Sequence, residues 1–85
     1  MTFKELIATF SPEAKKVLQK LAVVYGPTLI HAIESNLGDT EKRLLAKLVY
    51  KATIYTLHQA GVSTPIDMKT KLRKFLCSFL KIASF

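Results

Sequence analysis

The sequence has few of the residues that cross-link a chain or carry it through a membrane. It contains one cysteine, Cys77, so no disulfide can form within the chain, whereas small secreted domains usually depend on disulfides. The first residues include an acid and no apolar run of signal-peptide length, and no segment approaches about eighteen consecutive apolar residues. We therefore expect an intracellular protein, either cytoplasmic or, if eukaryotic or viral, nuclear.

Glycine, proline and tryptophan are also scarce. The three glycines and three prolines lie singly and tryptophan is absent, which argues against low-complexity or disordered segments. Eighty-five residues suffice for one hydrophobic core but not for two, so we expect a single domain over residues 1–85. Apolar residues nevertheless make up 49% of the chain, more than so small a body hides easily. This surplus favours a homodimer or another bound partner.

The sequence lacks a recognisable catalytic or metal-binding pattern. Its six acidic residues leave little for acid–base chemistry, and no glycine-rich phosphate loop, zinc-ligand spacing or nucleophile elbow occurs. His31 and His58 have no cysteine or carboxylate at ligand spacing, except that His31 precedes Glu34 by three residues. Di-metal bundles use the opposite order, Glu-x-x-His, and use it twice. We expect a protein that is not an enzyme and that holds no cofactor and no metal.

Hydrophobic spacing and helix-end signals predict an all-α fold. Apolar residues at helical spacing over residues 3–10 predict a short first helix. The Ser-Pro-Glu segment at 11–13 is typical of the beginning of a second helix, and the Gly-Pro pair at 26–27 is typical of its end. A short third helix is expected to follow and to end at Gly38.

Two further helices are predicted in the second half of the chain. One, the 40–60 helix, is expected to be capped by Asp39 or Thr40 and to be ended by Gly61. The other, the 65–83 helix, follows a cap at Thr64 and continues to about Ala83. No strand alternation of useful length occurs, and short connections favour antiparallel neighbours. The expected fold is all-α, a compact antiparallel bundle of four to five short helices.

Positive charge is concentrated in these two helices. Residues 42–85 carry nine Lys or Arg and one acid, Asp67, whereas residues 1–41 carry four Lys and five acids. The formal net charge of +7 and the sequence pI of about 9.8 therefore arise mainly from the second half of the chain. Such a local excess is typical of proteins that bind anionic partners.

The 40–60 helix is predicted to have two different faces. At about 100° per residue, one face is apolar and is expected to face the core: Leu44, Leu45, Leu48, Val49, Ala52 and Tyr55. The opposite stripe, with Leu57 at its edge, is mixed: Arg43, Lys47, Tyr50, Lys51, Ile54 and His58. Arg43, Lys47 and Lys51 follow one another at four-residue spacing, at which like charges on a helix repel slightly. A bound anion would relieve this repulsion.

Three interpretations of this stripe are open. It is a solvated face in which long basic side chains cover Tyr50 and Ile54. Alternatively, it is a basic ridge, with Tyr50 as a stacking or packing side chain, that fits a phosphate backbone or an acidic protein surface. In the third interpretation, Tyr50, Ile54 and Leu57 form the interface of a dimer and the basic residues surround it.

The 65–83 helix is basic and amphipathic. Its apolar face consists of Met68, Leu72, Phe75, Leu76, Phe79, Ile82 and Ala83, and its cations are Lys69, Lys71, Arg73, Lys74 and Lys81. The pattern fits a core helix with a basic outer side, a helix that contacts nucleic acid, or a helix on a membrane surface. Cys77 falls near these cations, which favour a reactive thiolate or a disulfide between chains, unless a small rotation of the helix buries it.

Our leading hypothesis is a non-enzymatic accessory protein that binds DNA or RNA through the phosphate backbone with little sequence specificity. The expected contact residues are Arg43, Lys47, Tyr50, Lys51, Lys69, Arg73, Lys74 and Lys81. The turn at residues 59–63 is compatible with a helix-turn-helix, but residues 64–67, which would lead the second helix, offer few groups for base edges.

The alternative is a protein-interaction module of the immunity, inhibitor or adaptor type, which binds an acidic or amphipathic partner. Its support is the surplus apolar surface expected around Tyr50, Ile54 and Leu57. A third hypothesis, supported by the basic 65–83 helix, is peripheral binding to anionic membranes.

Overall fold

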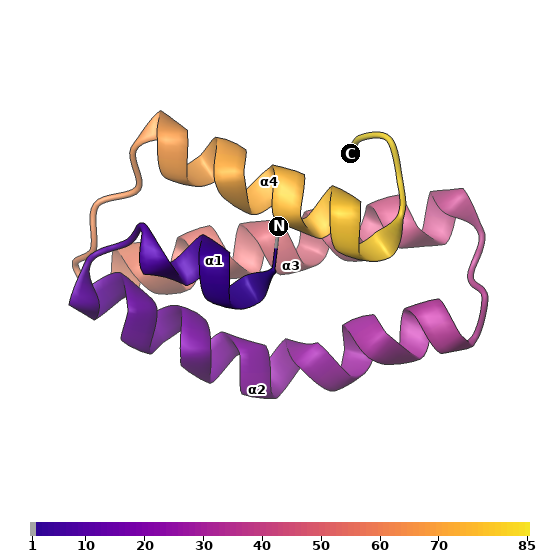
Figure 1. The fold of residues 1–85 in the computed structure, drawn as a ribbon, viewed down its shortest axis with the longest axis horizontal. Coiled ribbons are helices and arrows are strands. Elements are labelled where there is room, and N and C mark those ends of the chain that lie inside the picture. Colours follow the sequence, from indigo (N-terminus) through magenta and orange to yellow (C-terminus); the bar gives the residue numbers. More distant parts are fainter. Residues whose placement is uncertain (1) are drawn as a thin grey trace.

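The computed structural model describes residues 2–85, and within them four helices are present (Figure 1). They are α1 (Phe3–Ala8), α2 (Pro12–Glu34), α3 (Asp39–Gln59) and α4 (Ile66–Leu80). No strand occurs in this part of the chain. The expected all-α fold is therefore confirmed.

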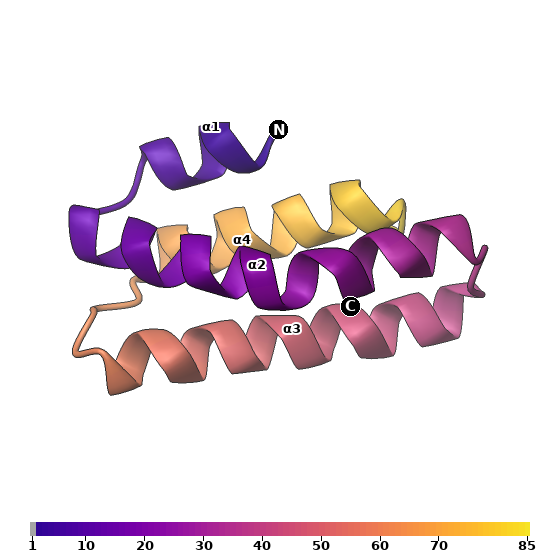
Figure 2. The same ribbon diagram turned by 90° about the horizontal axis from the view of Figure 1, so that it is seen from below.

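The helices pack around a shared core. α2 and α3 run in opposite directions, and α4 runs back along α3 (Figure 1, Figure 2). α1 contacts α2 and α4, and α3 contacts the same two helices from the other side (Figure 2). The expected antiparallel bundle is thus present. α3 and α4 lie alongside each other, without the wide crossing angle of a helix-turn-helix.

Two of the predicted helix-end signals act as expected. The Ser11 hydroxyl accepts a hydrogen bond from the main-chain N–H of Ala14 (3.2 Å), and Pro12 takes the first helical position, where no N–H partner is needed. After α3, Gly61 has a φ of +74°, a left-handed conformation that glycine adopts without strain. The beginning of α2 and the end of α3 are therefore set locally.

The predicted break at Gly26 and Pro27 is wrong, because α2 continues through both residues to Glu34. A proline inside a helix leaves one carbonyl unpaired, here that of Val23, and usually clashes with the Cβ of the preceding residue. Gly26 has no Cβ, so this clash is absent, and Val23 lies on the exposed side of α2 (77% exposed). α2 is instead curved along its length (Figure 1). The predicted third helix is the second half of α2.

Two other helix beginnings differ from the prediction. Gly38, and not one of the two residues after it, is the N-cap of α3. Pro65 takes that position at α4 in place of Thr64, and neither cap forms a side-chain hydrogen bond. The Thr64 hydroxyl lies 2.7 Å from Nε2 of His58, so it ties the loop to the end of α3.

The apolar face of α4 lies in the core, as the core-helix interpretation predicts. Its buried residues are Met68, Leu72, Phe75, Leu76 and Leu80, and Ile82 is buried just beyond the helix. α4 ends at Leu80, before the predicted end near Ala83, because Lys81 adopts the left-handed conformation with a φ of 59°. Ala83 is exposed and does not extend the apolar face.

The predicted core face of α3 is only partly correct, because Val49 is buried and Leu45 and Ala52 are half-buried, but the other three residues are exposed. The residues of α3 that are buried are Ala46, Val49, Thr53 and Leu57. Leu44, Leu48 and Tyr55 are instead 63%, 61% and 65% exposed. This buried side contacts α2 and α4, and the Thr53 hydroxyl is satisfied because it donates to the Val49 carbonyl (2.7 Å). α3 is therefore rotated so that part of its apolar pattern faces outward.

Candidate functional site

Three cations of α3 lie on its exposed side. Arg43, Lys47 and Lys51 are exposed and follow one another at four-residue spacing. Tyr50 lies on the side of α3 near α4, where it contacts Arg73. Arg43 lies seven residues before Tyr50 and Lys47 lies three residues before it, so both share that side of the helix. Lys51 lies farther round the helix, four residues from exposed Tyr55.

The cations of α4 approach α3 from the other side. Arg73 and Lys74 are exposed, as is Lys81 after the helix, whereas Lys69 is half-buried. The Arg73 guanidinium reaches Tyr50 of α3. The structure thus brings Arg73 of α4 to the side of α3 that carries Arg43 and Lys47. We call this surface the basic face, and it consists of Arg43, Lys47, Lys51, Arg73, Lys74 and Lys81.

Arg73 is clamped against two aromatic rings that contact each other. Its Cζ lies 4.5 Å from the ring centroid of Tyr50 and 4.9 Å from that of Phe85. Nη1 donates a hydrogen bond to the main-chain oxygen of Phe85 (2.9 Å), and the two rings meet edge to face with centroids 5.7 Å apart. Cation–π attraction and this hydrogen bond hold the guanidinium in place. Tyr50 therefore positions Arg73, and Phe85 is a residue that the sequence pattern did not single out.

The segment after α4 turns back beside α4 on the side of α3 (Figure 1, Figure 2). It closes a shallow pocket of about 240 Å³ that is lined by Arg73, Lys74, Cys77, Ala83, Ser84 and Phe85. Cys77 is half-buried there and packs against the main core cluster. The predicted position of Cys77 near basic residues is confirmed, because Arg73 and Lys74 line the same pocket. The packing of Cys77 against the core leaves the thiol only partly accessible.

The predicted dimer interface of Tyr50, Ile54 and Leu57 does not form an exposed surface. Leu57 has 0% exposure and packs with Ala14 and Met68. Ile54 is half-buried and packs against both core clusters. The ring of Tyr50 is in contact with the Arg73 guanidinium. The rotation of α3 turns these three side chains inward, toward α4.

The same rotation exposes a different apolar surface. Leu44, Leu48 and Tyr55 share one side of α3, and we call them the apolar strip. Val24 of α2 is 63% exposed. It lies level with Val49, which is next to Leu48 of the strip, because Val24 is ten residues before the end of α2 and Val49 is ten residues after the start of the antiparallel α3. Isolated exposed apolar residues are common, but several on one surface mark a contact site. The strip adjoins Lys47 and Lys51.

The histidines lie outside these surfaces. His31 is 3.1 Å from the hydroxyl of Ser35 through Nε2, and His58 contacts Thr64. Among residues 2–85, no three His, Cys, Asp or Glu side chains are grouped so that they could hold a metal ion. None of the helices in the described part of the chain combines the length and apolarity needed to cross a membrane.

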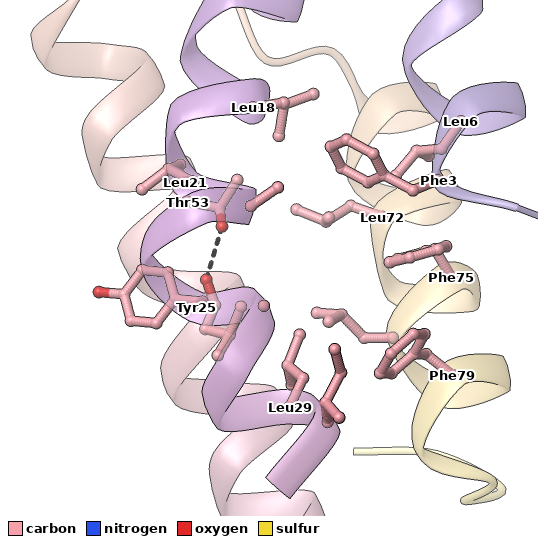
Figure 3. A pocket seen from close by; sticks show the side chains of 15 residues that line it. Phe3, Leu6, Leu18, Leu21, Tyr25, Leu29, Thr53, Leu72, Phe75 and Phe79 are labelled. Atoms are coloured by element: carbon pink, nitrogen blue, oxygen red, sulfur yellow. Dashed lines mark hydrogen bonds between the residues drawn. The ribbon is translucent and has the colours of Figure 1, made fainter.

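An apolar cavity of about 260 Å³ lies on the other side of the fold (Figure 3). α1, α2 and α4 form its walls, and Val49 and Thr53 of α3 form its floor. The cavity is open on one side.

Comparison with known proteins finds no matching family model, no matching curated protein and no matching solved structure. The function is therefore inferred from the residues of this chain alone.

Proposed function

We propose that this protein is a non-enzymatic accessory protein that binds nucleic acid through its basic face. The observation that supports the proposal is that Arg73 of α4 lies against Tyr50 of α3, the neighbouring helix on which Arg43, Lys47 and Lys51 are exposed. Cations from two helices can neutralise several phosphates of one backbone at the same time, and each neutralised phosphate releases condensed counterions. Backbone contacts of this kind carry little sequence information.

Few carboxylates oppose this positive field. α3 contains two acids, Asp39 and Glu41, both in its first turn, and α4 contains only Asp67. The clamp around Arg73 adds preorganisation, because a guanidinium that is already held loses less side-chain entropy on binding a phosphate. Half-buried Lys69 lies one turn before Arg73 and adds a positive charge at the edge of the basic face.

The salt dependence of binding tests this proposal. If five or six phosphates are engaged, the logarithm of the association constant should fall against the logarithm of salt concentration with a slope of about −5. Fluorescence anisotropy with random duplex DNA, duplex RNA and single strands would measure it, and a preference for one polymer would identify the ligand. A flat salt response, or no binding at low salt, would contradict the proposal.

The apolar strip favours a second candidate function, a protein-interaction module for an acidic, amphipathic partner. Leu44, Leu48 and Tyr55 supply the apolar contact, and Lys47 and Lys51 supply charge complementary to acids at its edge. Self-association through the strip is less favoured, because exposed Lys47 and Lys51 border it and their charges would repel those of a second copy. Membrane insertion of α4 has less support still, because its apolar face is buried in the core.

Purification with the tagged protein tests the second candidate. We expect one stoichiometric protein partner to remain bound after nuclease treatment and to be lost with Leu48→Asp, since the charge would enter an apolar contact. The control is Val23→Asp, which places the same charge on an exposed residue of α2 away from the strip. A partner that is lost after nuclease, or that Leu48→Asp retains, would count against this function.

A further inference from the structure

We propose that the cavity between α1, α2 and α4 binds a linear, uncharged hydrocarbon chain of about ten carbons, such as the chain of a fatty alcohol or acyl group. This site is separate from the basic face. α1 and α3 contact the α2–α4 pair from opposite sides, and the cations of the basic face belong to α3, to α4 and to the segment after it.

The walls of the cavity are formed by aliphatic and aromatic side chains. Each wall helix contributes: Phe3 and Leu6 from α1; Leu18, Leu21, Ala22, Tyr25, Gly26, Leu29 and Ile30 from α2; Leu72, Phe75, Leu76 and Phe79 from α4. Figure 3 shows the labelled side chains of α1 and α4 facing those of α2 across the space. Dispersion contacts with such a lining favour hydrocarbon over any polar ligand.

The cavity offers a ligand no unpaired polar group. None of the fifteen described lining residues is charged. The Thr53 hydroxyl already donates to the Val49 carbonyl, and the Tyr25 hydroxyl points away from Phe75 and Phe79 (Figure 3). Water needs two to four polar partners to stay in such a space, and a charged group would lose its hydration without replacement. The ligand portion inside the cavity is therefore uncharged.

Size and shape favour a linear chain. An apolar cavity of about 150 Å³ is known to accept benzene, so a volume of about 260 Å³ corresponds in proportion to roughly ten carbons. The lining residues of α2 run from Leu18 to Ile30, which at 1.5 Å per residue is about 18 Å along the helix axis. An elongated space of this kind suits an extended chain better than a compact ring.

The short first helix leaves the cavity open at one side. α1 has only six residues, and both α2 and α4 extend beyond it (Figure 1, Figure 2). Phe3, at the beginning of α1, and half-exposed Ile30 both line the cavity. A hydrocarbon chain can therefore enter without unfolding of the bundle, and a polar head group can stay in solvent.

Titration of the full chain with 1-decanol, followed by methyl NMR, tests the proposal. We expect saturable one-to-one binding, with shift changes at the methyl groups of Leu29, Leu72 and Leu76. The exposed methyl groups of Leu44 and Leu48 should not change, because they lie on the apolar strip of α3. Absence of saturation up to the solubility limit, or changes centred on the strip, would overturn the proposal.

Cavity-filling variants sharpen the test. Ala22→Leu places three additional carbons in the wall, so decanol affinity should fall at least about tenfold while the helix is preserved. Val23→Leu is the matched control, because it enlarges the neighbouring, exposed residue and should leave the affinity unchanged. If Ala22→Leu does not fold, flexible Ala22→Met replaces it. A folded filling variant that binds decanol as well as the parent would overturn the site.

Discussion

Replacement of Leu57 by alanine should lower the free energy of unfolding by about 3 kcal/mol. Leu57 has 0% exposure and packs with Ala14 and Met68, so the truncation leaves a space that the surrounding helices fill only in part. Because an 85-residue domain is expected to have roughly 4–13 kcal/mol of stability, the loss is a large fraction of the total. Urea denaturation followed by far-UV circular dichroism would measure it.

Leu48→Ala is the matched control, because it removes the same atoms from the same helix. Leu48 is 61% exposed, so the free energy of unfolding should change by no more than about 0.5 kcal/mol. The apolar pattern of α3, taken alone, predicts the reverse order of the two effects. If Leu48→Ala is the more costly substitution, the orientation of α3 described above is wrong.

Reversal of two charges on the basic face, Lys47→Glu with Lys51→Glu, should weaken nucleic-acid binding by roughly 10- to 100-fold at about 100 mM salt. Both side chains are exposed and lie on the face proposed to meet the phosphate backbone. The slope of the salt dependence should become shallower by about 2, since two phosphate contacts are lost. All sequences should be affected alike, because backbone contacts do not read bases. Anisotropy titrations with several unrelated sequences would measure both effects.

Lys16→Glu with Lys20→Glu provides a closely matched control. These two lysines are exposed on α2, are also four residues apart, and their reversal changes the net charge by the same amount. Only the general attraction between protein and nucleic acid should weaken, so the loss of affinity should be much smaller. Equal losses in both double variants would mean that net charge alone drives binding, and a loss confined to one sequence would indicate base-specific contacts.

Several features of this fold could be predicted because their physical causes act over a few residues. The Ser11 cap depends on a hydrogen bond to Ala14, and the end of α3 depends on the positive φ of Gly61. The buried face of α4 was predictable for a related reason. α4 has one apolar stripe with a basic opposite side, so only one rotation buries the stripe.

α3 and the middle of α2 could not be predicted in this way. α3 has apolar side chains on nearly all sides, so its own pattern allows more than one rotation. Contacts with α2 and α4 select the side with small Ala46 and Thr53, and those helices are separate segments of the chain. At Pro27, the local rule predicts a break, but the missing Cβ of Gly26 and the packing of both halves of α2 keep the helix continuous.

The sequence by itself determined the helical class, several of the helix ends and the concentration of positive charge in residues 42–85, because composition and local propensity are sufficient for these. Only the tertiary structure decided which cations lie together, how Tyr50 and Phe85 clamp Arg73, and where the apolar cavity forms. Each of these features needs side chains from different segments of the chain to meet. The packing of the helices against one another, rather than any single helix, determines the distances between those side chains.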